Sequence, residues 1–81
     1  MSEIISLANL KVGQIGEIVE MKENGKTIYV HEKLGIAKGM YVIVLQQAVE
    51  AVEWLVQVGY NQIFLKKDML NNIKVKLIKS L

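Results

Sequence analysis

The stretch Gly39-Met40-Tyr41-Val42-Ile43-Val44-Leu45 contains the longest unbroken apolar run of this 81-residue chain, from Met40 to Leu45. Its β-branched and aromatic residues favour a strand, and apolar residues on both faces are typical of a strand buried on both sides. A membrane span needs about 20 apolar residues, so this run is too short to be one. We therefore expect a buried central strand in a soluble domain.

The sequence after the central strand predicts a β-hairpin. Residues 54–58 alternate well enough to form its first strand. Gly59-Tyr60-Asn61-Gln62 is a turn signal, and Ile63-Phe64-Leu65 would be the returning strand. The residues expected to share one face are Trp54, Val56, Val58 and Tyr60.

The last part of the chain predicts a short helix and then a strand. Residues 68–73 fit a helix, because Met69 and Ile73 are an i, i+4 pair. Residues 74–78 alternate, with Val75 and Leu77 expected inside and Lys74 and Lys76 outside. Outward lysines would protect this strand, taken as an edge, from pairing with other molecules.

Turn signals surround the first strand. Ser6 can cap a single helical turn over residues 6–10, and Gly13 and Gly16 predict a turn that leads into the strand. Gly59 is the third glycine expected to serve a structural turn. Such glycines more often serve turns and close backbone approach than phosphate binding.

The first strand is expected over residues 15–21, with Ile18 on the face opposite to Ile15, Val19 and Met21. Glu23-Asn24-Gly25-Lys26 predicts a turn. Residues 27–34 carry mixed signals: β-branched residues favour a strand, while Gly35 after Leu34 favours a helix end. We expect one or two helical turns there.

Together these elements predict a mainly β fold, a closed or partly closed barrel of about five short strands with two or three helical turns. The length allows a single domain over residues 1–81. The chain has no Cys, which excludes disulfides and thiolate metal sites. The N-terminal residues lack a signal-peptide pattern, so we expect the protein in the cytoplasm.

Charge gives a weak functional signal. All ten positive charges are Lys and the net charge is +2. Five Lys and one Asp give residues 54–81 a net charge of +4, which could contact phosphates. The absence of Arg weakens that hypothesis, since Arg makes the bidentate phosphate and guanine contacts. A Lys-rich barrel that contacts nucleic acid or a nucleotide stays an alternative.

The residues that carry chemistry are sparse. The single histidine, His31, has no serine nucleophile near it in sequence, and no phosphate-loop or nucleophile-elbow motif is present. We therefore expect no enzyme. His31 and Glu32 are weak candidate metal ligands, but a tight site needs three or four ligands. No tightly bound cofactor is expected, and at most a weak association with Fe²⁺.

Three segments together resemble one family. They are Ser6 to Val19 with its Lys11-Val12-Gly13 signal, the motif Leu34-Gly35-Ile36-Ala37-Lys38-Gly39 followed by a strand, and the tail from Val58 to Ile73. Each segment is weak alone, but their order and spacing are similar to those of the ferrous iron transport protein A (FeoA) family. The similarity covers roughly residues 6–78.

This resemblance implies an SH3-like small barrel and an accessory, non-enzymatic role in ferrous iron uptake. The implied partner is the cytosolic GTPase region of a ferrous iron permease, through which alone the protein would meet a membrane. The resemblance also implies family-level binding of transition metal ions. No nucleic acid is expected as a partner, and weak self-association stays open.

Two segments are candidate docking surfaces. The loop that joins the expected helix to the central strand is one, and the apolar connector after that strand is the other, since exposed apolar patches often mark interfaces. The candidate contact residues are Leu34, Gly35, Ile36, Lys38, Gly39, Val49 and Val52.

Overall fold

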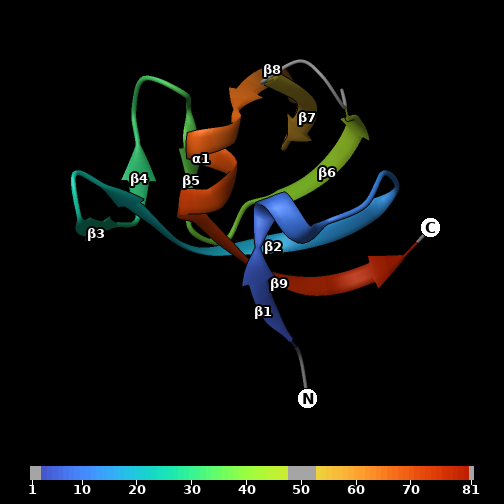
Figure 1. Ribbon diagram of the computed structural model, residues 1–81, viewed down its shortest axis with the longest axis horizontal. Helices are drawn as coiled ribbons and strands as arrows, with labels where there is room; N and C mark the ends of the chain where they lie inside the picture. The colour runs from blue at the N-terminus through green and yellow to red at the C-terminus, as the bar shows by residue number, and fades with distance from the viewer. Residues whose placement is uncertain (1–2, 48–52, 81) are drawn as a thin grey trace.

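The computed structural model describes residues 3–47 and 53–80, without the side chains of the last two (Figure 1). The strands are β1 (Ile4–Ser6), β2 (Gln14–Glu23), β3 (Lys26–Ile28), β4 (Val30–His31), β5 (Ile36–Ala37), β6 (Tyr41–Gln46), β7 (Glu53–Val58), β8 (Asn61–Lys66) and β9 (Ile73–Ser80). The helices are a 3₁₀ turn, η1 (Leu7–Asn9), and α1 (Lys67–Asn72). The predicted mainly β fold is confirmed.

One curved antiparallel sheet carries the fold, in the order β1-β9-β2-β6-β7-β8, with β3 paired to β2 (Figure 1). β4 and β5 form a separate two-stranded sheet. In the described ranges no pairing of β1 with β8 closes the sheet, so the partly closed alternative fits. No described helix is long and apolar enough to cross a membrane.

The core lies on the concave side of this sheet and includes residues from η1, α1 and most strands. Its buried residues are Leu7, Leu10, Ile18, Met21, Ile36, Val42, Val44, Val56, Val58, Leu65, Leu70, Ile73 and Val75. The prediction that the central strand is buried on both faces was wrong. In β6, Val42 and Val44 are buried, but Tyr41 is 57% exposed, because only one face of this antiparallel sheet is covered.

β2 also differs from its predicted faces. Its pairing with β9 shifts register between Ile18 and Glu20, a bulge that adds one residue to one strand. The bulge reverses the alternation, so Ile18 and Met21 both enter the core, while Ile15 and Val19 are half-buried. Strict alternation put Ile18 and Met21 on opposite faces, and that prediction was wrong.

The helical turns predicted over residues 27–34 are absent. Asn24 (φ 52°) and Gly25 (φ 78°) form a tight turn that sends the chain back along β2 as β3, with Ile28 opposite Met21. Gly35 (φ 68°) ends the β4–β5 turn, not a helix. Strand pairing outweighs the local helix signal of this segment.

The predicted C-terminal hairpin and helix are confirmed, with corrections. β7 and β8 are joined by Gly59 and Tyr60, but Tyr60 is 102% exposed and does not share the inner face of Val56 and Val58. β9 is not an edge strand, since it lies between β1 and β2. Lys74 and Lys76 therefore do not guard an edge of the sheet.

The N-terminal turn forms as predicted. Ser6 precedes η1 and its hydroxyl accepts a hydrogen bond from the Ala8 N–H at 3.3 Å. Gly13 (φ 89°) is the turn residue before β2. Gly16 is not a turn residue: it lies within β2, where a Cβ would come 2.9 Å from the Val75 side chain. Its function is to allow close approach of β9.

Candidate functional site

His31 contacts one residue of β2 and one of its own turn. Its Nε2 lies 3.6 Å from the Glu23 carboxylate, and its Nδ1 accepts a hydrogen bond from the Leu34 N–H at 3.4 Å. The predicted neighbour Glu32 is exposed in the turn between β4 and β5. Among the described residues no three His, Cys, Asp or Glu side chains gather as a metal-ligand group. The hydrogen bond with Leu34 stabilises the turn between β4 and β5, and the contact with Glu23 joins that turn to β2.

The predicted docking loop, residues 34–39, is tied by its backbone to β2 and to Tyr29, between β3 and β4. The Gly39 N–H donates to the Ile18 carbonyl at 2.7 Å, and the Lys38 N–H donates to the Tyr29 carbonyl at 2.8 Å. Ile36 is only 1% exposed, so its side chain belongs to the core and is unsuited to direct docking. The backbone of the loop is therefore fixed by hydrogen bonds, and only a few of its side chains are accessible to a partner.

The other predicted docking residues have different places in the fold. Leu34 is half-buried and packs against the core, while Gly35 and Gly39 are exposed with φ of 68° and 92°. Lys38 is exposed, with its Nζ 5.1 Å from the centre of the Tyr29 ring, a cation–π contact. Val49 and Val52 lie outside the described residues.

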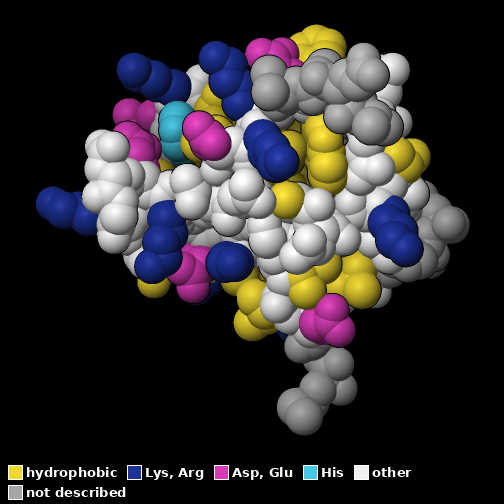
Figure 2. All heavy atoms as spheres, in the orientation of Figure 1, with side chains coloured by type: hydrophobic (Ala, Val, Ile, Leu, Met, Phe, Trp, Pro, Cys, Tyr) yellow, Lys and Arg dark blue, Asp and Glu magenta, His cyan; other side chains and the backbone are white. Residues whose placement is uncertain are grey.

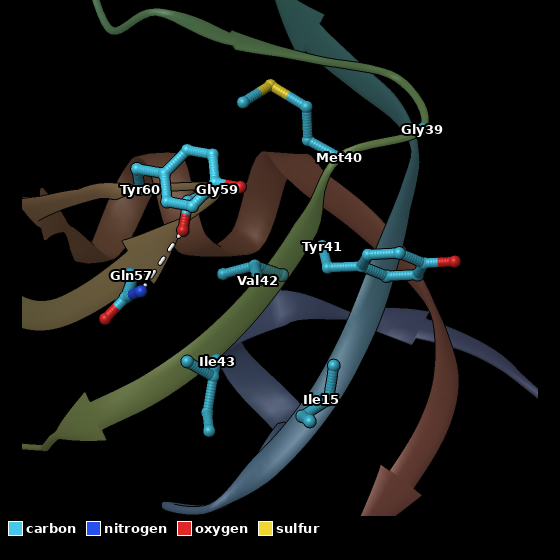
Figure 3. A pocket seen from close by; sticks show the side chains of 9 residues that line it. All are labelled: Ile15, Gly39, Met40, Tyr41, Val42, Ile43, Gln57, Gly59 and Tyr60. Carbon is cyan, nitrogen blue, oxygen red and sulfur yellow. Dashed lines mark hydrogen bonds between the residues drawn. The ribbon is translucent and has the colours of Figure 1, made fainter.

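An open apolar hollow of about 400 Å³ begins where this loop ends (Figure 3). It is lined by the β2, β6 and β7 strands and the β7–β8 turn. The lining residues are Ile15, Gly39, Met40, Tyr41, Val42, Ile43, Gln57, Gly59 and Tyr60. The hollow thus joins the end of the predicted docking loop to the exposed turn of the hairpin.

The pairing register of β2, β6 and β7 determines which side chains form the floor of the hollow. Ile43 pairs with Ile15 on one side and with Gln57 on the other, so these three side chains form a row across the sheet. Val42 and Val44 face the core, and the pleat therefore turns Tyr41 and Ile43 outward. Figure 3 shows Ile15 beside Ile43 at one end of the hollow.

The hairpin turn that forms the wall is fixed by two hydrogen bonds. The Gly59 N–H donates to the Tyr41 carbonyl at 3.2 Å, and the Gln57 side-chain amide donates to the Gly59 carbonyl at 3.1 Å (Figure 3). Gly59 has φ 60°, the left-handed value that a two-residue turn needs at its first position. Tyr60 is thereby held in solvent at the mouth of the hollow.

Sequence reasoning missed this site. It assigned Tyr60 to a strand face and Tyr41 and Ile43 to a strand buried on both sides. The available signal was Gly59: a glycine with one residue before the returning strand marks a tight hairpin turn, which places Tyr60 at its tip. Nothing local indicated that the outer face of β6 stays uncovered.

Charge on the surface is mixed. Lys74 lies opposite Glu20, and Lys76 lies opposite Glu17, on neighbouring strands of the sheet. Lysines and acidic side chains are also interspersed on the face shown in Figure 2. Cross-strand pairs of opposite charge reduce the field that a basic strand presents to phosphates. Lys74 and Lys76 thus each face an acidic residue on the neighbouring strand.

Comparison with known proteins identifies the family. The family model described as FeoA domain matches residues 5–77. The chain belongs to the FeoA domain family. No curated protein matches the chain. A solved structure, "Crystal Structure of Iron Uptake Regulatory Protein (FeoA) Solved by Sulfur SAD in a Monoclinic Space Group", superposes with a TM-score of 0.74 at 18% identity, covering 94% of this chain and 99% of that one.

These comparisons confirm the predicted family and the small SH3-like fold. At 18% identity the solved structure supports the fold alone, and the family follows from the match over residues 5–77. The large curved sheet, the N-terminal turn and the short helix before the last strand therefore belong to the fold of a FeoA domain.

Proposed function

We propose that this FeoA-domain protein is a non-enzymatic accessory protein of ferrous iron uptake, which acts in the cytoplasm. It works by binding the cytosolic GTPase region of a ferrous iron permease. The observation that carries the proposal is the FeoA family match over residues 5–77. The permease is the only route by which this protein meets the membrane.

The apolar hollow is the contact surface that we assign to this partner. Tyrosine is enriched in protein interfaces because it combines a large apolar ring with a polar end. Tyr41 and Tyr60, both exposed, stand at a hollow of about 400 Å³, large enough for apolar side chains of a partner. Hydrogen bonds fix the Tyr41 carbonyl and Gly59, the neighbour of Tyr60, which reduces the entropy lost on binding.

The exposed end of the predicted docking loop extends the same surface. Gly39 belongs to both the loop and the hollow, and Lys38 precedes it. We propose that Lys38, Leu34 and Gly35 contact the partner at the rim, while Ile36 supports the loop from inside the core. Lys38 would contribute attraction to acidic groups at the rim, which affects the association rate more than affinity.

Binding to the purified cytosolic region of the permease, measured by calorimetry with and without guanine nucleotide, tests the proposal. We expect Tyr41→Ser and Tyr60→Ser each to raise the Kd at least about fivefold, the usual effect at an important interface residue. Ile4→Ser is the matched control, since Ile4 is 62% exposed on β1, away from the residues that line the hollow, and should leave the Kd unchanged.

Two results would count against the proposal in different ways. No binding at high micromolar concentration, whichever nucleotide is present, would contradict the function. Binding that neither tyrosine variant weakens would contradict the hollow as the contact surface while leaving the function standing.

The nucleic-acid alternative has a distinct signature. Binding through the lysines would fall steeply as salt rises, because phosphate contacts release counterions. The positions of Glu17 and Glu20 opposite Lys76 and Lys74 argue against it.

A further inference from the structure

β8 ends the main sheet as an open edge. It pairs with β7 over its whole length, and no strand in the described ranges pairs with its other side. Its residues Gln62, Phe64 and Lys66 are exposed, Phe64 by 65%. Leu65 on the inner face is buried, but no strand in the described part of the chain covers the outer edge of β8.

The register shows which backbone groups the edge presents. A two-residue turn makes Val58 and Asn61 a hydrogen-bonded pair, and hydrogen-bonded and non-bonded pairs alternate along an antiparallel ladder. The N–H and C=O groups of Gln62, Phe64 and Lys66 therefore point away from β7. Lys66 is also the N-cap residue of α1, so its carbonyl already accepts the first hydrogen bond of that helix, and the open groups are those of Gln62 and Phe64 and the Lys66 N–H.

The usual protections of a sheet edge are weak in β8. Edges are commonly kept short, bulged or charged. The opposite edge, β1, has three residues, whereas β8 has six and pairs with β7 without a register shift. Its only charge is Lys66, the last residue of the strand. β8 is thus a long, regular and mostly uncharged template for another strand.

We propose that β8 pairs antiparallel with β8 of a second copy of this chain, centred on Phe64. In this register Phe64 faces Phe64 of the second copy, and Gln62 faces its Lys66. The Phe64 N–H and carbonyl of each strand then pair with those of the other, and each Lys66 N–H donates to a Gln62 carbonyl. The Gln62 N–H donates to the Lys66 carbonyl, which accepts it with its second lone pair beside its bond within α1. The main sheet continues across the two-fold axis into the second molecule.

Side chains and charges fit this register. The two Phe64 rings would meet on the outer face, beside Leu55, which is paired to Phe64 within each copy. Aromatic cross-strand pairs are stabilising, and like charges directly opposite are destabilising. Centring on Phe64 places Lys66 opposite a neutral amide, whereas centring on Lys66 would place two lysines face to face. The strand is therefore complementary to itself in one register.

Sedimentation velocity on the full chain, from about 20 μM to about 1 mM, tests the dimer. We expect a concentration-dependent dimer with a Kd on the order of 10⁻⁴ M, since one strand pair gives a small interface. Phe64→Lys places two charges at the two-fold axis and should raise the Kd at least about tenfold. Val30→Lys, at a residue 58% exposed on β4, should not change it.

A backbone test separates strand pairing from simple apolar contact. Gln62→Pro removes an N–H that has no partner within the monomer, so the monomer should fold, as circular dichroism would verify. The same change removes hydrogen bonds of the dimer and should also raise the Kd at least about tenfold. Gln62→Ala keeps the N–H and should leave the Kd within about twofold of the wild-type value.

Three outcomes with this chain alone would overturn the inference. They are a wild-type protein that stays monomeric up to 1 mM, a dimer that survives both Phe64→Lys and Gln62→Pro, and a dimer that Val30→Lys weakens equally. Pairing of β8 with an extended segment of another protein, with the chain itself monomeric, would likewise exclude the self-pairing. None of these outcomes bears on binding to the permease, which uses the hollow.

Discussion

Gly16 shows how one residue sets the distance between two strands. A Cβ at this position would come 2.9 Å from the Val75 side chain and 3.4 Å from Leu10. Gly16 and Val75 are buried within the paired strands β2 and β9, and Leu10, which follows η1, is buried beside them. The sequence predicted a turn or a close backbone approach at Gly16, but gave no indication of the strand that would approach it. Its close contact with Val75 joins residues far apart in the chain.

We predict that Gly16→Ala destabilises the protein by about 1–3 kcal/mol, because the added methyl group overpacks the core against backbone-fixed Val75. Gly35→Ala is the comparison: nothing lies within 4 Å of its added Cβ, and only its φ of 68° opposes the change. That left-handed backbone costs about 1–2 kcal/mol. Urea denaturation measures both values.

The two variants differ in how they respond to a second change. Val75→Ala should relieve part of the Gly16→Ala cost, since it removes the Cγ2 methyl group that lies 2.9 Å from the new Cβ, although the Val75 Cβ at the same distance stays. It should leave the Gly35→Ala cost unchanged. Additive effects of Gly16→Ala and Val75→Ala would show that close approach is not the reason for the glycine.

At the scale of elements, the local predictions that are confirmed are those that agree with the tertiary pairing of the strands. The Ser6 cap, the hairpin of β7 and β8 and the helix α1 form close to their predicted bounds. The helical turns of residues 27–34 do not form, because the turn at Asn24 and Gly25 pairs that segment with β2. The bulge in β2 also left no local signal, since it arises from pairing with β9.

The bulge gives a prediction that strict alternation does not. Ile18 is 1% exposed, and its truncation to Ala should cost about 2–5 kcal/mol through lost apolar contact and a cavity. Val19 is only half-buried, so Val19→Ala should cost about 1 kcal/mol or less. Equilibrium denaturation compares them. A larger loss for Val19→Ala than for Ile18→Ala would mean that the bulge does not place Ile18 in the core.

At the scale of the whole molecule, Ser6 connects the two ends of the fold. Its hydroxyl donates to the Leu70 carbonyl at 3.0 Å, across 64 positions of sequence, and accepts from the Ala8 N–H. β1 pairs with β9 beside this contact. The N-terminal turn and the C-terminal helix are thus held against the same side of the core.

Ser6→Ala should therefore lower stability by about 1–2 kcal/mol, since it removes a helix cap and leaves a half-buried carbonyl without its partner. For a domain of this size the melting temperature should fall by about 4–15 °C. Asn9→Ala, at an exposed residue of the same turn, should shift it by less than about 3 °C. Equal shifts in the two calorimetric scans would contradict the cross-chain role of Ser6.

The sequence by itself determined the fold class, the capped N-terminal turn, the closing hairpin and helix, and the family, because each depends on local propensity or on motifs kept in order. Tertiary structure decided which faces are covered. Pairing between distant segments determines which side of β2 faces the core and places β9 inside the sheet. It also determines the outward row of Ile15, Ile43 and Gln57 and the open edge of β8. The physical reason is that a strand's pattern predicts two faces, but only its neighbours determine which face and which edge remain in water.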